Sequence, residues 1–288
     1  MSPPRALLSL VIPAYNEEGA VADTVLRARK ALRRAKIAHE ILVVDDGSTD
    51  GTAKAARAVG ARVLSQGENR GYGASLKAGY RAAKGNLLAM VDADGSYLPE
   101  DLPALVLAME EADMVVGART RADAAIPALR KPAKWLLKRW AEYLSERTIP
   151  DLNSGLRVFR REPYERFQGL MPNRFSFTTT LTLSLECHGF VVKYLPVDYR
   201  PRVGDSKIRP IRDTANFFSL VLRTVMYFKP LKFFIPMGGF MFLVGVGIGV
   251  EKLVVEHGIS DATTLMTVAG LQIAALGLLA DLMVKRNR

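Results

Sequence analysis

Residues 87–94, LLAMVDAD, decide the fold class, because five apolar residues run without a break into the acidic triplet Asp92-Ala93-Asp94. An uncharged run of this length is typical of a strand buried on both faces, as in parallel sheets covered by helices. Side chains alternate between the two faces of a strand, so the two carboxylates lie on the same side. The alternative interpretation is a capped turn that leads through Pro99-Glu100-Asp101 into the next helix.

The first half of the chain repeats this pattern of apolar strand followed by helix. Strands are predicted at 7–12, 40–44, 62–65, 87–91 and 114–117, and helices at 19–38, 52–59, 73–83 and 102–111. The alternation predicts an α/β fold with a doubly wound sheet, in which ligands bind beyond the carboxyl ends of the strands. Three polar clusters, at 13–17, 45–48 and 92–94, stand at such ends, and we expect them to form one site. Residues 118–210 are interpreted as basic helix and loop.

The acidic triplet predicts a cation site. Two neighbouring carboxylates repel each other unless a cation lies between them, and a hard ion such as Mg²⁺ or Mn²⁺ bridged to a diphosphate fits. The ion would stabilise a nucleoside diphosphate as it leaves. Asp92 and Asp94 are therefore the predicted ligands.

The two upstream clusters fit a nucleoside. Tyr15 is suited to stacking on a base, and Glu17 to accepting a hydrogen bond from a base or a ribose. An aspartate at the end of the second strand can accept the imide N–H of uracil or guanine. Asn16 fits a cap on the helix that follows.

Other features exclude several classes of function. Gly71-Tyr72-Gly73 lacks the third glycine of a dinucleotide fingerprint, so NAD binding is rejected. The net charge of +11 suits nucleic acid, an anionic membrane, a phosphorylated substrate or simply a solvated surface. No recognised nucleic-acid motif is present, so no nucleic-acid partner is expected. The single Cys187 excludes an internal disulfide framework.

The C-terminal part, 231–288, predicts a transmembrane hairpin with spans at about 233–250 and 265–284. Eighteen uncharged residues make a helix of about 27 Å, close to the thickness of a bilayer core. Lysine and arginine flank both ends of the hairpin, so both ends are expected in the cytoplasm. A pair of buried helices in a soluble core is the alternative.

Two segments before the hairpin are also predicted to be helical. Residues 211–230 indicate an amphipathic helix lying on the membrane. Residues 133–146 fit either a core-packed helix or a basic, aromatic helix at a lipid–water boundary.

Five motifs carry a family resemblance: PAYNE (13–17), VVDDGSTDGT (43–52), NRGYGASLKAG (69–79), VDAD (91–94) and NSGLRVFRR (153–161). In this order they resemble family 2 glycosyltransferases of the GT-A fold over residues 7–207. Within that family they are similar to polyprenyl-phosphate glycosyltransferases, such as dolichyl-phosphate mannose or glucose synthases and bacterial undecaprenyl-phosphate enzymes.

The resemblance implies a catalytic domain over residues 1–210 with a doubly wound mixed sheet of GT-A type. It also implies a metal-dependent hexosyltransferase that moves a sugar, with inversion, from a UDP- or GDP-sugar to undecaprenyl or dolichyl phosphate. The expected location is a bacterial or archaeal inner membrane with the catalytic domain in the cytoplasm, and a homo-oligomer is compatible with it.

The resemblance also implies roles for single residues. The nucleotide sugar is assigned to Pro13, Tyr15, Glu17, Asp45, Asp46, Asp92 and Ala93. The metal ion is assigned to Asp92 and Asp94, with Ser96 at the position where many relatives have a glutamine ligand. The acceptor phosphate is assigned to Arg119, Lys134, Lys138 and Arg202. Arg202 and Lys207 belong to a mobile loop that closes over the phosphates, so Asp92, Asp94, Arg202 and Lys207 are the predicted catalytic residues.

Two other interpretations remain at this point. A polysaccharide synthase of the same fold is disfavoured, because Arg139-Trp140 lacks the glutamine of a Gln-x-x-Arg-Trp motif and the hairpin is too small to line a polymer channel. A membrane-anchored, non-catalytic nucleotide-sugar-binding protein is motivated by Ser96 in place of glutamine.

Overall fold

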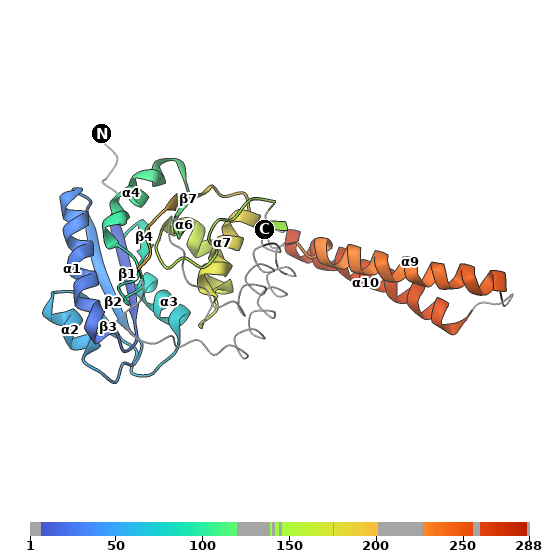
Figure 1. The fold of residues 1–288 in the computed structure, drawn as a ribbon, viewed down its shortest axis with the longest axis horizontal. Coiled ribbons are helices and arrows are strands. Elements are labelled where there is room, and N and C mark those ends of the chain that lie inside the picture. Colours follow the sequence, from blue (N-terminus) through green and yellow to red (C-terminus); the bar gives the residue numbers. More distant parts are fainter. Residues whose placement is uncertain are drawn as a thin grey trace. The chain divides into compact units, whose positions relative to one another are not determined.

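The computed structural model describes residues 7–119, 139, 142–143, 146–174, 176–200, 227, 229–255 and 260–286. The chain divides into two compact units, Met1–Pro210 and Ile211–Arg288. The first unit is a sheet flanked by helices, and the second contains two long helices (Figure 1). Most of the predicted amphipathic helix at 211–230 and most of the predicted helix at 133–146 lie outside the described residues.

A mixed seven-stranded sheet forms the centre of the first unit, in the order β3-β2-β1-β4-β6-β5-β7. The strands are β1 (Leu8–Ala14), β2 (His39–Asp45), β3 (Arg62–Ser65), β4 (Leu87–Met90), β5 (Met114–Ala118), β6 (Arg157–Arg160) and β7 (Val192–Pro196). Strand β6 runs antiparallel to both β4 and β5, and the other neighbours are parallel. The mixed sheet that the family resemblance implied is therefore confirmed.

The first five strands begin and end within two residues of their predicted limits, but β6 and β7 were missed. The interpretation of 118–210 as basic helix and loop was wrong there. Strand β6 has four residues and an arginine at each end, so it carries too little apolar pattern to be recognised. Strand β7 is mostly half-buried and contains Lys193.

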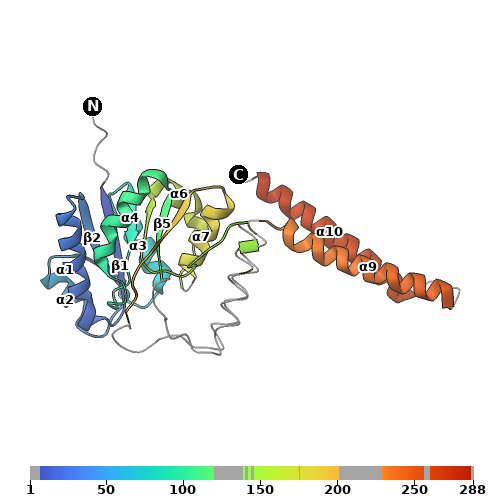
Figure 2. The same ribbon diagram turned by 45° about the horizontal axis from the view of Figure 1, so that its top comes forward.

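Helices cover both faces of the sheet (Figure 1, Figure 2). They are α1 (Glu18–Arg34), α2 (Thr52–Ala58), α3 (Tyr72–Ala82), α4 (Leu102–Leu107), α6 (Arg161–Phe167) and α7 (Phe177–Cys187), with short 3₁₀ turns at Pro99–Asp101, Ala108–Glu111 and Gln168–Leu170. The predicted helix at 19–38 ends early at Arg34, because Lys36 has a φ of 55° and the chain turns into β2.

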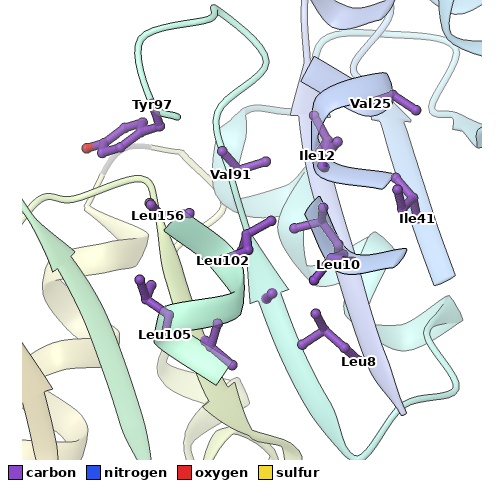
Figure 3. Packing of buried hydrophobic residues seen from close by; sticks show 14 of the residues in the cluster. Leu8, Leu10, Ile12, Val25, Ile41, Val91, Tyr97, Leu102, Leu105 and Leu156 are labelled. Atoms are coloured by element: carbon purple, nitrogen blue, oxygen red, sulfur yellow. The ribbon is translucent and has the colours of Figure 1, made fainter. Parts of the chain in front are cut away.

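Alternation along the strands produces two separate cores. Leu8, Leu10 and Ile12 of β1 pack with α1 and α4 on one face, as Figure 3 shows. Val11, from the same strand, packs with α3, α6 and α7 on the other face. Burial on both faces explains why the central strands are almost wholly apolar.

The second unit is a hairpin of α9 (Leu231–Val255) and α10 (Asp261–Arg286), both long and apolar enough to cross a membrane. Small residues lie where the helices touch. A Cβ added to Gly238 would stand 2.7 Å from the carbonyl oxygen of Gly270, and one added to Gly245 would stand 2.6 Å from Thr267 Oγ1. Close backbone approach of this kind is typical of helix pairs in membranes. The outward faces are apolar and exposed, for example Phe240 and Leu271.

Gly79 allows α3 to lie directly on the sheet, and this contact can be tested. A Cβ added there would stand 2.4 Å from Val11 Cγ1, a branched side chain fixed in the core. We expect Gly79→Ala to cost about 1–3 kcal/mol through overpacking, so the melting temperature of the detergent-solubilised protein falls. Gly19→Ala is the matched control, because Gly19 is also helical and has nothing within 4 Å of the added Cβ. Equal melting temperatures for the two variants would contradict the contact.

Candidate functional site

The three polar clusters share one edge of the sheet. Strand β1 lies between β2 and β4 and is parallel to both, so their carboxyl ends meet. Pro13 and Ala14 are the last residues of β1, and Asp45 is the last residue of β2. Asp92 follows β4 by two residues. The expectation that these clusters converge is met by the topology.

Hydrogen bonds join the loop after β1 to the loop after β2. The backbone N–H of Asn16 donates to Ser48 Oγ at 2.9 Å, and Asn16 Oδ1 accepts from the backbone N–H of Thr49 at 2.8 Å. The backbone N–H of Glu17 donates to Thr52 Oγ1 at 2.8 Å. Asn16 has a φ of 54°, which asparagine tolerates better than most residues. Its side chain therefore ties two loops together, and the prediction of a helix cap was wrong: Glu17 is the capping residue and makes no side-chain cap bond.

The two neighbouring aspartates after β2 have different surroundings. Asp46 accepts three hydrogen bonds, from Gln66 Nε2 and the backbone N–H groups of Arg70 and Gly71, each at 2.9 Å. Both carboxylate oxygens of Asp46 are thus used in hydrogen bonds to the segment between β3 and α3. The side chain of Asp45 makes one hydrogen bond within the described part of the chain, from the backbone N–H of Ser48 at 3.1 Å.

The acidic triplet is held by the first residue of α3 and by a serine of its own loop. Tyr72, the first residue of α3, donates its hydroxyl to Asp92 Oδ1 at 2.8 Å. Burial, together with the charge of Asp92, raises the pKa of Tyr72 well above its usual value, so the hydroxyl keeps its proton. Ala93 is buried, and Ser96 donates to Asp94 Oδ1 through both its backbone N–H (3.1 Å) and its Oγ (2.5 Å). Ser96 thus binds the carboxylate of Asp94, which is itself a predicted metal ligand.

A loop from β6 packs against the triplet on another side. A Cβ added to Gly155 would stand 2.0 Å from Asp92 Oδ2, so only glycine fits there. The backbone N–H of Gly155 donates to the hydroxyl oxygen of Tyr97 at 2.8 Å. Tyr97 lies near Leu156 in Figure 3 and packs edge-on against Tyr199, with ring centroids 5.1 Å apart.

Arg119, predicted to contact an acceptor phosphate, pairs with Asp151 through two hydrogen bonds of 2.7 and 2.8 Å. Burial, the largest single effect, acts to lower the pKa of Arg119, but the hydrogen bonds to Asp151 and the electrostatic effects of Tyr97, Asp151 and Tyr199 together raise that pKa. The guanidinium also lies 5.3 Å from the ring centroid of Tyr199. Arg119 is therefore a fixed cation beside the Gly155 loop.

Arg157 was not singled out from the sequence, although it lies in the NSGLRVFRR motif. It is completely buried, and burial lowers its pKa. Its guanidinium donates to the carbonyl oxygens of Leu152 and Ser154, each at 2.8 Å, and to Thr178 and Thr182 of α7 at 3.1 and 2.5 Å. An arginine placed between the apolar residues Leu156 and Val158 is the signal that could have identified it.

Four predicted residues, Lys134, Lys138, Arg202 and Lys207, lie outside the described residues. Within the described ranges, no group of three or more His, Cys, Asp and Glu side chains is arranged to hold a metal ion. Two carboxylates are nevertheless a suitable donor set for Mg²⁺ or Mn²⁺. Such an ion commonly takes one or two protein carboxylates and completes its shell with phosphate oxygens and water.

The hydrogen bonds of Asp46 predict a specific effect of replacing it. Asparagine would direct an NH₂ group at one of the partly buried N–H donors, with a loss of about 1.5–3 kcal/mol. We expect Asp46→Asn to release the Arg70–Gly71 peptide, so that trypsin cuts after Arg70 and mass spectrometry detects a fragment ending there. Asp45→Asn is the control and should not expose this bond, because its amide oxygen can still accept from Ser48. An uncut Arg70–Gly71 bond in Asp46→Asn would contradict the assignment.

Comparisons with known proteins agree with this architecture. The family model for glycosyl transferase family 2 matches residues 9–167, and that for the GtrB C-terminal hairpin matches residues 229–285. The chain is 31% identical over 250 residues to the undecaprenyl-phosphate 4-deoxy-4-formamido-L-arabinose transferase of Pseudomonas fluorescens, covering 84% of this chain and 72% of the relative. It is 29% identical over 282 residues to the low-salt glycan biosynthesis hexosyltransferase Agl6 of Haloferax volcanii, covering 94% and 67%.

The fold is also similar to that of a solved enzyme. Glucosyl-3-phosphoglycerate synthase of Mycobacterium tuberculosis, crystallised with Mn²⁺, UDP and phosphoglyceric acid, superposes with a TM-score of 0.61 at 20% identity, covering 77% of this chain and 78% of that one. At that identity the likeness concerns the fold. The family 2 model covers more than half of the chain and includes all three strand-end clusters, so this protein belongs to glycosyl transferase family 2.

Proposed function

We propose that this protein is a membrane-anchored inverting glycosyltransferase that moves a sugar from a UDP- or GDP-sugar to a polyprenyl phosphate. The observation that carries the proposal is the presence, in one chain, of a family 2 domain and a hairpin that matches the GtrB C-terminal hairpin. A hairpin of two apolar helices suits an acceptor that is itself anchored in the membrane. Relatives named for transfer to undecaprenyl phosphate support the same acceptor class.

We assign the nucleoside to the joined loops after β1 and β2, with Pro13, Tyr15, Glu17 and Asp45. Tyr15 and Glu17 are half-buried at the strand edge. Asp46 uses both oxygens on the chain before α3, so Asp45 is the better candidate for accepting the imide N–H of uracil or guanine. Asp46 then acts on the site by shaping the loop.

We assign the donor diphosphate and a divalent ion to Asp92 and Asp94. A bound Mg²⁺ or Mn²⁺ would supply Lewis-acid stabilisation of the charge on the leaving diphosphate. Ser96 is assigned to orienting Asp94, because both of its donors meet one oxygen of that carboxylate.

The acceptor needs little activation. A phosphate monoester is largely ionised near neutral pH, with a second pKa of about 6. One of its oxygens forms the bond to the anomeric carbon while the bond from that carbon to the donor diphosphate breaks, and the diphosphate leaves with the electron pair. The configuration inverts, no covalent sugar–enzyme intermediate forms, and no general base is required.

The remaining task of the protein is to bring two anions together. Arg119 is a fixed cation beside the Gly155 loop, although Asp151 accepts hydrogen bonds from two of its guanidinium nitrogens. Lys134, Lys138, Arg202 and Lys207 are assigned to the phosphates on the family resemblance. We place the catalytic domain and both hairpin ends in the cytoplasm, because basic residues flank both ends. A homo-oligomer stays a prediction.

The reaction itself is tested with membranes containing the protein, radiolabelled UDP- and GDP-sugars, short-chain polyprenyl phosphates and Mn²⁺ or Mg²⁺. We expect label in a lipid whose mass is that of the acceptor plus one sugar. EDTA should abolish transfer and added Mn²⁺ restore it, while Asp94→Asn should reduce it at least a hundredfold, about 2.7 kcal/mol of transition-state stabilisation. Full activity of Asp94→Asn would refute the metal assignment, and absence of lipid product with every donor would refute the acceptor.

The base-binding role of Asp45 makes a separate prediction. In Asp45→Asn one acceptor oxygen becomes an NH₂ donor, so when the amide oxygen accepts from the backbone N–H of Ser48, the NH₂ group faces the imide N–H of the base. Loss of a hydrogen bond to a charged group costs about 1.5–3 kcal/mol, which corresponds to at least a tenfold weaker affinity for the nucleoside diphosphate. Calorimetric titration with UDP and GDP measures this, and an unchanged melting temperature shows that the fold is intact. Wild-type affinity in Asp45→Asn would contradict the assignment.

A further inference from the structure

We infer that Tyr72 is a positioning residue for the metal ion: with Gly155 it clamps the carboxylate of Asp92 in the one orientation that binds the ion. The inference rests on the proposed function, because it concerns the same metal site. Its basis is the pair of contacts on Asp92, the hydroxyl of Tyr72 on Oδ1 and the α-carbon of Gly155 beside Oδ2.

The position of Tyr72 is itself fixed from outside α3. The loop at 172–174 packs on the start of the helix, where the backbone N–H of Ala74 donates to the carbonyl oxygen of Asn173 at 2.7 Å. A Cβ added to Gly73 would stand 2.1 Å from the carbonyl oxygen of Pro172. Gly71, with a φ of 102°, starts the helix in a conformation that favours glycine. The two glycines therefore let the loop at 172–174 pack against the start of α3, and this packing fixes the position from which Tyr72 reaches Asp92.

The opposite side of the clamp is equally constrained. Arg157 holds the carbonyl oxygens of Leu152 and Ser154 and so fixes the loop that leads to Gly155. Tyr97 accepts the backbone N–H of Gly155. Asp92 thus lies between a helix and a loop that are anchored independently, which restricts the rotation of its carboxylate.

This arrangement has a consequence for metal affinity. A carboxylate that accepts a hydrogen bond on one oxygen presents its other lone pairs in a defined direction, and no rotational freedom is then lost when the ion binds. Outer contacts of this kind typically change metal affinity about 10–100-fold when they are removed. We expect removal of the Tyr72 hydroxyl to weaken metal affinity by a factor in this range, solely through its contact with Asp92.

The same helix offers a matched control. Tyr80 is also a tyrosine of α3 and is almost completely buried, and its hydroxyl has no hydrogen-bond partner among the described residues. Tyr80→Phe removes a tyrosine hydroxyl from α3 as Tyr72→Phe does, but it leaves the hydrogen bond to Asp92 in place. A difference between the two variants therefore reports the contact with the carboxylate.

The experiment measures binding of Mn²⁺ by electron paramagnetic resonance of the free ion, with the full chain in detergent and UDP or GDP present in parallel. We expect Tyr72→Phe to weaken Mn²⁺ binding about tenfold or more, with Tyr80→Phe within twofold of the wild type. In an Asp92→Ala background, Tyr72→Phe should have no further effect, because the acceptor of the Tyr72 hydroxyl is gone. This double-mutant comparison separates positioning from a general loss of stability.

Each result decides a different point. Equal Mn²⁺ affinities for Tyr72→Phe and the wild type would overturn the inference and leave the proposed function standing. The same loss in Tyr80→Phe, or a further loss from Tyr72→Phe in the Asp92→Ala background, would also overturn it. A wild-type protein that binds no Mn²⁺ with either nucleotide would overturn the metal-dependent function together with the inference.

Discussion

The buried guanidinium of Arg157 is the interaction on which the site depends. A charge removed from water costs several kcal/mol unless hydrogen bonds replace its hydration. Here the acceptors come from two places that are distant along the chain, the loop at 152–154 and helix α7. The loop cannot move away without leaving part of the guanidinium unsatisfied. Since Gly155 extends from this loop and touches Asp92, the buried charge fixes one wall of the acidic site.

The antiparallel direction of β6 is the reason why the loop held by Arg157 lies next to Asp92. A parallel strand between β4 and β5 would begin at the opposite edge of the sheet, and its preceding loop would lie far from the carboxyl end of β4. Because β6 runs the other way, its first residue, Arg157, pairs with Met90 at the end of β4. The loop before it therefore arrives beside Asp92. The reversal of one short strand places the NSG segment and the acidic triplet together.

Prediction from the sequence succeeded where the information is local. Strands β1, β2 and β4 are apolar runs with polar ends, and parallel order alone brings those ends to one edge. It failed where a contact spans long distances in the chain. The hydroxyl of Tyr72 reaches a residue 20 positions away, and Arg157 reaches α7. Asn16 was interpreted as a local cap, but its partner Thr49 is 33 positions away. The spacing of residues within a motif does not indicate hydrogen-bond partners that are distant in the sequence.

The two halves of the site are built in different ways. The half that we propose for the nucleoside consists of loops whose backbone N–H groups meet short side chains, Asn16, Ser48 and Thr52. The half that we propose for the metal ion depends on Tyr72 of α3 and on Gly155 in the loop before β6, each anchored elsewhere. A substitution in the first half therefore acts on the loop that contains it. A substitution of Tyr72, Gly155 or Arg157 changes the position of the Asp92 carboxylate, although none of these residues is itself a proposed metal ligand. We therefore expect the proposed chemistry to be more sensitive to packing around Asp92 than to changes around the base.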